Sequence, residues 1–205
     1  GTMRGHFSPA MTMHLIDIGA NLTHDSFDRD RDAVLDRARQ AGVVQMVITG
    51  ASREHSPLAV QLAQQHPGFL YATAGVHPHH AVEYTEECDA EMRALHAHPE
   101  VVAVGECGLD YFRDFSPRPA QHRAFERQLQ LAADNGKPLF LHQRDAHADF
   151  MAQMKNFDGQ LGPAVVHCFT GERDELFDSL DPDWYIRITG WLSDERRRAH
   201  PREPG

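Results

Sequence analysis

Three short apolar runs, each leading to a side chain that can bind a metal, constrain this sequence more than any other feature. Each run ends in one such side chain: Glu106 after residues 101–105, His142 after residues 138–141 and His167 after residues 163–166. Apolar runs this short are typical of strands buried on both faces of a parallel sheet. A lone buried carboxylate is costly, so Glu106 needs a partner such as a cation.

The three runs belong to a longer alternation of strands and helices. Seven apolar stretches of strand length are found at residues 14–22, 43–50, 70–75, 101–106, 139–142, 164–167 and 184–190. Stretches of helical length and spacing lie between them, at residues 28–41, 56–66, 86–98, 119–135, 146–156 and 172–180. Repeated strand–helix units of this length predict an α/β fold with a parallel sheet.

The strand ends indicate which kind of parallel sheet to expect. No glycine-rich dinucleotide fingerprint follows a strand, which disfavours a nucleotide-binding doubly wound sheet. A TIM (β/α)8-type barrel places its active site at the carboxyl ends of its strands, where Glu106, His142 and His167 stand. A complete barrel needs eight strands and about 250 residues. We therefore expect a TIM-type barrel that is truncated after its seventh strand.

The 205 residues are expected to form one domain, residues 14–195, with an N-terminal extension at 1–13 and an irregular tail at 196–205. No apolar run is long enough to cross a bilayer, and no N-terminal leader with a cleavage site is present. The three cysteines form no paired framework, as in a reducing compartment. We expect a cytoplasmic monomer without a membrane partner.

The charge balance limits how the chain could hold a polyanion. Thirty acidic residues against 20 basic ones give a formal net charge of −10. This excludes a broad basic face for nucleic acid, so a polyanionic substrate would need metal ions and a few local arginines. The 15 histidines are numerous enough to prompt a search for metal ligands.

Strand geometry and ligand chemistry both favour a metal site. Side chains alternate along a strand, so Glu106 shares its side with Val104 while Cys107 points to the helix layer. By the same rule Cys168 is a packing residue beside His167. One carboxylate and two imidazoles suit zinc, manganese or, with more water, magnesium.

Six ordered motifs carry a family resemblance, at residues 17–23, 73–79, 105–110, 142–146, 167–171 and 188–191. In this order and spacing they resemble the TatD family of metal-dependent deoxyribonucleases. The resemblance covers about residues 14–195 and implies a TIM barrel of the amidohydrolase type that hydrolyses phosphodiesters. It further implies a 3′–5′ exonuclease acting on single-stranded DNA or RNA.

The resemblance also implies roles for individual residues. Glu106 matches a carboxylate that can bridge two metals, and His142 and His167 match further metal ligands. His77, in a Gly-Val-His-Pro motif, matches an active-site histidine that contacts the substrate phosphate. A divalent metal is expected as cofactor, with Mg²⁺ first and Mn²⁺ or Zn²⁺ as the other choices. A two-metal site of this kind activates a water and neutralises charge on the attacking and leaving oxygens.

Two departures from the family pattern stand out. Gly19 and Asn21 occupy the positions of a His-x-His pair found in many members, a form that the TatD branch itself shares. The family's eighth strand ends in a metal-binding aspartate, and nothing after residue 190 matches that motif. The departures leave an inactive truncated fragment as one alternative function. The other is an amidohydrolase that acts on a small ester or amide.

Aromatic and cationic residues after Glu106 form a candidate substrate surface. It comprises Tyr111, Phe112, Arg113, Phe115 and Arg118. Interleaved rings and arginines suit base stacking beside a phosphate backbone. The equally weighted alternative is that two of the rings pack against the next helix. Arg144, which follows His142, could hold a phosphate or instead pair with Asp145.

Overall fold

A computed structural model describes residues 15–167 and 184–186. Several sequence predictions lie outside the described residues. They are the extension at 1–13, the packing of Cys168, the helix near 172–180, the part of the last strand after residue 186 and the tail at 196–205.

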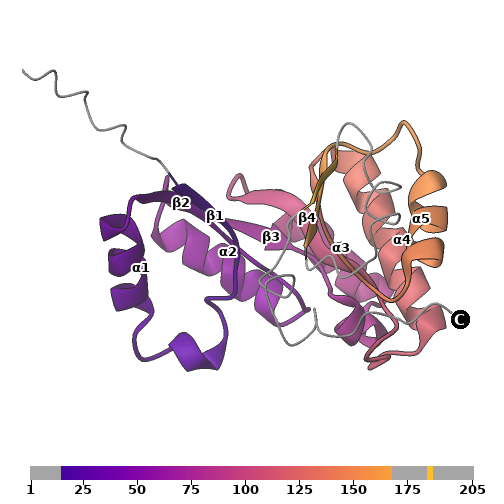
Figure 1. The fold of residues 1–205 in the computed structure, drawn as a ribbon, viewed down its shortest axis with the longest axis horizontal. Helices are drawn as coiled ribbons and strands as arrows, with labels where there is room; N and C mark the ends of the chain where they lie inside the picture. Colours follow the sequence, from indigo (N-terminus) through magenta and orange to yellow (C-terminus); the bar gives the residue numbers. More distant parts are fainter. Residues whose placement is uncertain (1–14, 168–183, 187–205) are drawn as a thin grey trace, which may run out of the picture.

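Among the described residues, seven parallel strands form one sheet in which spatial order follows chain order from β1 to β7. The strands are β1 (Leu15–Ala20), β2 (Val43–Ile48), β3 (Leu70–Ala74), β4 (Val101–Asp110), β5 (Leu139–Arg144), β6 (Ala164–His167) and β7 (Trp184–Ile186). The sheet is curled, as in a partly closed barrel (Figure 1). The predicted α/β fold of TIM-barrel type is confirmed, with all carboxyl ends of the strands on one rim.

In residues 15–167, five α-helices connect the strands and cover the outer face of the sheet (Figure 1). They are α1 (Arg31–Gln40), α2 (His55–Gln65), α3 (Glu86–Leu95), α4 (Arg118–Asn135) and α5 (His147–Lys155). Two short 3-10 turns, η1 (Asp25–Phe27) and η2 (Pro78–Glu83), lie in the connections. In the described part of the chain, no helix has the length and apolar character needed to cross a membrane.

Local sequence signals set the helix ends. Thr85 caps α3 by accepting a hydrogen bond from the Cys88 amide, and acidic residues fill the first turn, where the helix dipole favours negative charge. Gly136 ends α4 in the left-handed conformation at φ 69°, which glycine adopts without a steric penalty. These capped ends fix where the chain enters and leaves the sheet.

The core lies between the sheet and the helices. Phe125 of α4 stacks on Phe150 of α5 with ring centroids 5.3 Å apart, and both rings are fully or nearly fully buried. Cys88 and Cys107 are free and buried, so Cys107 packs in the core, as the strand alternation predicts. Burial of these side chains is the main favourable term for a fold of this kind.

The central strands are longer than predicted. β4 continues past residue 106 to Asp110, and β5 continues past residue 142 to Arg144. Two glycines in β4 let β5 approach closely. A Cβ atom at Gly108 would lie 1.8 Å from the His142 carbonyl oxygen, and one at Gly105 would lie 2.0 Å from that of Phe140. The extended pairing carries the strands past the residues that form the site.

Candidate active site

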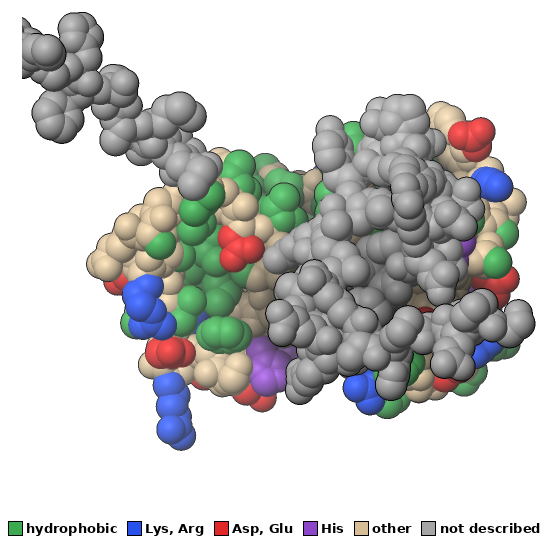
Figure 2. Space-filling view, viewed as in Figure 1, with side chains coloured by type: hydrophobic (Ala, Val, Ile, Leu, Met, Phe, Trp, Pro, Cys, Tyr) green, Lys and Arg blue, Asp and Glu red, His purple; other side chains and the backbone are tan. Residues whose placement is uncertain are grey.

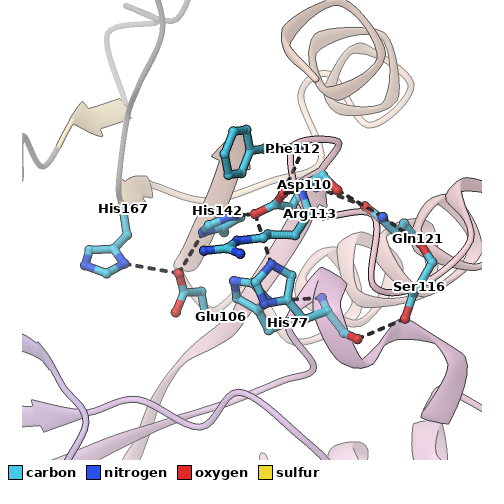
Figure 3. A network of polar contacts seen from close by, with 10 residues as sticks. His77, Glu106, Asp110, Phe112, Arg113, Ser116, Gln121, His142 and His167 are labelled. Carbon is cyan, nitrogen blue, oxygen red and sulfur yellow. Dashed lines mark hydrogen bonds and ion pairs between the residues drawn. The ribbon is translucent and has the colours of Figure 1, made fainter. Parts of the chain in front are cut away.

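The carboxyl ends of β4, β5 and β6 bring together the side chains that the sequence singled out (Figure 3). Glu106 Oε1 lies 3.3 Å from His142 Nδ1 and 3.1 Å from His167 Nδ1. Glu106 and His142 are buried, and His167 is partly buried. The predicted trio of Glu106, His142 and His167 therefore meets at one carboxylate oxygen.

Asp110 holds His142 from the opposite side of its ring. Its Oδ2 lies 2.9 Å from His142 Nε2 and 3.1 Å from His79 Nε2. Its Oδ1 accepts hydrogen bonds from the backbone amides of Phe112 and Arg113 at 3.1 and 2.9 Å. A carboxylate on the outer nitrogen of a histidine fixes ring orientation and tautomer in many metal sites. Asp110 thus directs the other nitrogen of His142 toward Glu106.

The carboxyls of Glu106 and Asp110 are held in their charged form. Burial disfavours the charge on Glu106, but the His142 ring 3.3 Å away and the hydrogen bond with His167 outweigh burial and lower the pKa of Glu106 well below the usual range. Burial also opposes ionisation of Asp110, and the His142 ring with the Arg113 amide again lowers the pKa. Two anionic groups are therefore ready to receive cations.

His142 between these carboxylates takes up a proton when no other cation is present. Burial lowers the pKa of His142, but its interactions with Asp110 and Glu106 outweigh burial and raise it to about 9. The ring thus carries positive charge at neutral pH. A metal ion bound at Nδ1 would replace this proton while Asp110 keeps the proton on Nε2.

The side chains present fit a divalent metal ion. Within the described residues, the ligand atoms of His77, Glu106 and His142 all lie within 4.8 Å of one another. His142 Nδ1 is buried and faces Glu106 without a well-aligned hydrogen bond. A buried imidazole nitrogen in this state beside an ionised carboxylate matches the nitrogen and oxygen donors of zinc or manganese sites. The site can hold a metal on chemical grounds.

His77 is distinguished from the other members of this group by a backbone hydrogen bond. Its Nδ1 accepts a hydrogen bond from the His79 amide at 3.1 Å. Burial, with the nearby charge of His142, lowers the pKa of His77 to about 3, so the ring is neutral at pH 7. A neutral ring whose Nδ1 accepts carries its proton on Nε2. His77 therefore offers an N–H donor to the site, which suits an anionic oxygen better than a metal.

Sequence reasoning gave no role to Asp110 or to two glutamines of α4. Gln121 accepts from the Asp110 amide and donates to its carbonyl, at 2.9 and 3.1 Å. Gln128 does the same for Val76, immediately before His77, at 2.8 and 3.0 Å. Two sequence signals were available. Asp110 follows Glu106 by four positions, so the two side chains share one face of the strand. Gln121 and Gln128 lie seven positions apart and share one face of the helix.

The candidate substrate surface divides into two parts. The Tyr111 hydroxyl donates to Asp149 of α5 and contacts His122 of α4, and the Arg118 guanidinium covers the ring. Tyr111 therefore packs against the next helices, α4 and α5. Phe112 and Phe115 are exposed, and the Arg144 guanidinium lies 3.7 Å from the Phe112 ring centroid. Figure 3 shows Phe112 and Arg113 extending from the turn after Asp110 toward His142.

Comparison with known proteins finds sequence relatives that are described as nucleases. The family model described as TatD related DNase matches residues 16–203. A "3′-5′ ssDNA/RNA exonuclease TatD" of Musicola paradisiaca is 50% identical over 183 residues, which are 89% of this chain and 69% of the relative. The protein with the same description from Edwardsiella piscicida is 52% identical, and the match covers 89% of this chain and 70% of the relative.

Two solved structures share the fold. An uncharacterised amidohydrolase from Saccharomyces cerevisiae superposes with a TM-score of 0.77 at 27% identity, covering 86% of this chain and 68% of the other. A TatD homologue from Escherichia coli k12 superposes with a TM-score of 0.76 at 30% identity, with the same coverage. Both sequence and fold therefore agree with the resemblance carried by the motifs.

Proposed function

The chain belongs to the family of TatD-related DNases, and on that premise we propose that it hydrolyses phosphodiester bonds at the 3′ end of single-stranded DNA or RNA with a divalent metal. The observation that carries the proposal is the ionised, buried Glu106 between two strand-end histidines, with the N–H donor of His77 beside it. The descriptions of the relatives supply the substrate and the direction of cleavage.

Glu106, His142 and His167 are the proposed metal ligands. The family resemblance supports Mg²⁺ as the first choice, and the two imidazole donors support Mn²⁺ and Zn²⁺ as the alternatives. A divalent ion held there supplies Lewis-acid polarisation of the phosphate and a lower pKa for an attacking water. Asp110 keeps His142 oriented toward this position through the 2.9 Å contact at Nε2.

His77 is proposed to bind the scissile phosphate. Its neutral ring presents Nε2–H, which donates to a non-bridging oxygen and stabilises the charge that grows there in the transition state. Arg113 and Arg144 are proposed to hold the phosphate of a neighbouring nucleotide, since both guanidiniums lie at the turn beside the site. Tyr111 supports this turn through Asp149 and His122.

We also propose a cytoplasmic, monomeric protein. The unpaired thiols of Cys88 and Cys107 support a reducing compartment. Size-exclusion chromatography with light scattering tests the monomer, and fractionation of the source cells tests the location.

The proposed function is tested on a 5′-labelled single-stranded DNA oligonucleotide with Mg²⁺, Mn²⁺, Zn²⁺ or EDTA. We expect products that shorten from the 3′ end in the presence of metal and no products with EDTA. Glu106→Gln should lower the rate by at least about 100-fold, the scale of losing one group that stabilises transition-state charge. Glu86→Gln, at an exposed position in the first turn of α3, is the matched control.

Two results would contradict the proposal. One is cleavage that survives either EDTA or Glu106→Gln, because the metal and its carboxylate would then be dispensable. The other is metal-dependent turnover of a panel of small esters or amides without cleavage of nucleic acid, which would assign the site to an amidohydrolase.

A further inference from the structure

The turn between β4 and α4 displays two phenylalanine rings to solvent beside the active site. Phe112 is 53% exposed and Phe115 is 65% exposed. By contrast, Phe125, Phe140 and Phe150 are almost completely buried. Exposing two large rings in one short turn is unfavourable in water unless a ligand covers them, and such apolar surface beside a candidate active site is typical of a binding site.

The turn that carries the rings is held rigidly. Asp110 Oδ1 accepts from the Phe112 and Arg113 amides, which fixes the start of the turn. The buried Ser116 hydroxyl donates to the His79 carbonyl at 3.0 Å, and Gln121 donates to the Ser116 carbonyl at 2.9 Å. The backbone that carries the rings is therefore ordered before a ligand arrives, which lowers the entropy cost of binding.

Two arginines provide positive charge next to the rings. The Arg144 guanidinium lies 3.7 Å from the Phe112 centroid, and that of Arg113 lies 5.5 Å from Phe112 and 5.8 Å from Phe115. Such cation–π contacts hold the rings and leave the guanidinium edges free to pair with phosphate. In a chain with a net charge of −10, cations grouped around exposed rings are a specific feature.

The rings are connected to the active site through one imidazole. The His79 ring centroid lies 4.8 Å from that of Phe115 and 4.3 Å from that of His77. His79 Nε2 also contacts Asp110, which orients His142. A strand whose phosphate lies against His77 therefore has a neighbouring base within reach of this turn.

From these contacts we propose that Phe112 and Phe115 form a stacking platform for a base of the single-stranded substrate, with Arg113 and Arg144 beside its phosphate. The inference rests on the proposed nuclease function and deepens it by naming the base-binding residues. Every base has a π face, so a platform of this kind accepts DNA and RNA without sequence readout. Only unpaired bases can enter it, which selects for single strands.

The test measures binding with Ca²⁺ in place of Mg²⁺, under conditions where a gel shows no cleavage of the probe. The probes are a dye-labelled oligothymidylate and the same strand with one abasic nucleotide placed at successive positions near the 3′ end. For wild-type protein, fluorescence anisotropy should show binding about 5- to 150-fold weaker at one abasic position, the affinity equivalent of one lost base–ring stack. Phe112→Leu and Phe115→Leu keep apolar bulk but remove the ring. Each should bring the ratio of the two dissociation constants, abasic strand over intact strand, toward one.

Leu58→Ala, at an exposed apolar position in α2, is the control and should keep the wild-type ratio. Equal binding of intact and abasic strands by wild-type protein, no binding of either strand, or an unchanged ratio in both leucine variants would each overturn the platform. A change of oligomeric state in the variants with an unchanged ratio would instead assign the rings to a protein interface. Cleavage of the intact strand with Mg²⁺ is scored separately, so that failure of the nuclease and failure of the platform are distinguishable.

Discussion

Strands β1 and β4 are both apolar and lie in one parallel sheet, but their surroundings differ. In β4 the residues from Val104 to Asp110 are all buried. In β1, Leu15, Ile16 and Ile18 are exposed, with Ile16 at 56%. Apolar side chains accordingly gather at the β1–β2 end of the face seen in Figure 2.

Neighbours explain the contrast. β4 is flanked by β3 and β5 and covered by α4, whereas in the described part of the chain β1 pairs with β2 alone. Burial around β4 excludes water from Glu106 and Asp110, and electrostatic interactions are stronger where water is excluded. The candidate site residues Glu106 and Asp110 thus lie in a strand that has neighbours on both edges and a covering helix, and β1 contributes no comparable group of buried charges among the residues described.

The largest expected difference between the two strands is in stability. Leu109→Ala in β4 removes a fully buried side chain and should lower the free energy of unfolding by about 2–5 kcal/mol. Ile16→Ala in β1 removes a mostly exposed side chain and should cost less than about 1 kcal/mol. Urea unfolding followed by circular dichroism measures both. Equal losses would mean that β1 is covered to the same degree as β4 in solution.

The next difference concerns the carboxylates of the two strands. Asp110→Asn removes the charge that holds His142 and His79 and should weaken Mn²⁺ binding by about 10- to 100-fold, the usual effect of losing the partner of a metal-binding histidine. Asp17→Asn, in β1, is the matched control and should leave the affinity within about twofold. Electron paramagnetic resonance of free Mn²⁺ gives the affinity without reference to activity. The same Mn²⁺ affinity in both variants would show that Asp110 does not support metal binding.

The last expected effect, comparable in size to that of Asp110→Asn, is the pH dependence of metal binding at the β4–β5 rim. The pKa of His142 is raised to about 9, so at pH 7 the ring is protonated and a metal must displace that proton. Affinity should rise by about tenfold per pH unit from pH 7 and level off near pH 9. Asp110→Asn removes one of the two groups that raise this pKa, so its curve should level off at lower pH. A flat profile for the wild-type protein would show that no proton leaves the site on binding.

The free energy of unfolding of the metal-free protein should also depend on the protonation of His142, but it should fall with rising pH where the metal affinity rises. Because the folded pKa of His142 lies above its usual value near 6.5, protonation stabilises the fold fully below that value. The contribution is lost as pH rises through about 9. Between pH 7 and pH 9, the metal affinity should therefore rise while the free energy of unfolding of the metal-free protein falls. Electron paramagnetic resonance and urea unfolding at the same pH values measure the two.

Much of this arrangement could be predicted from local patterns. The seven strands follow from short apolar runs, and the meeting of Glu106, His142 and His167 follows from their positions at strand ends, because a parallel barrel brings those ends to one rim. Asp110 could have been included, since it shares the strand face of Glu106. The extra length of β4 does not follow from the apolar pattern, which ends at residue 106; Gly105 and Gly108 permit the close strand pairing that extends it.

Other features depend on contacts between residues far apart in the chain. The sequence could not divide the aromatic turn into a packed Tyr111 and exposed Phe112 and Phe115, because Asp149 of α5 decides that division. Nor could it assign the buried glutamines of α4, whose partners are backbone groups of other elements. The role of Gln128, which holds Val76 from 52 positions further along the chain, is visible only in the folded molecule.

By itself, then, the sequence determined the strand order, the identity of the ligand types and the family, because apolar periodicity and strand-end residues are local properties of the chain. The tertiary structure alone decided the charge and proton positions of the site. It buried Glu106 between His142 and His167, placed Asp110 behind His142, and fixed the proton of His77 through the His79 amide. Protonation depends on burial and on the distance to other charges, and both are set only when strands and helices pack together.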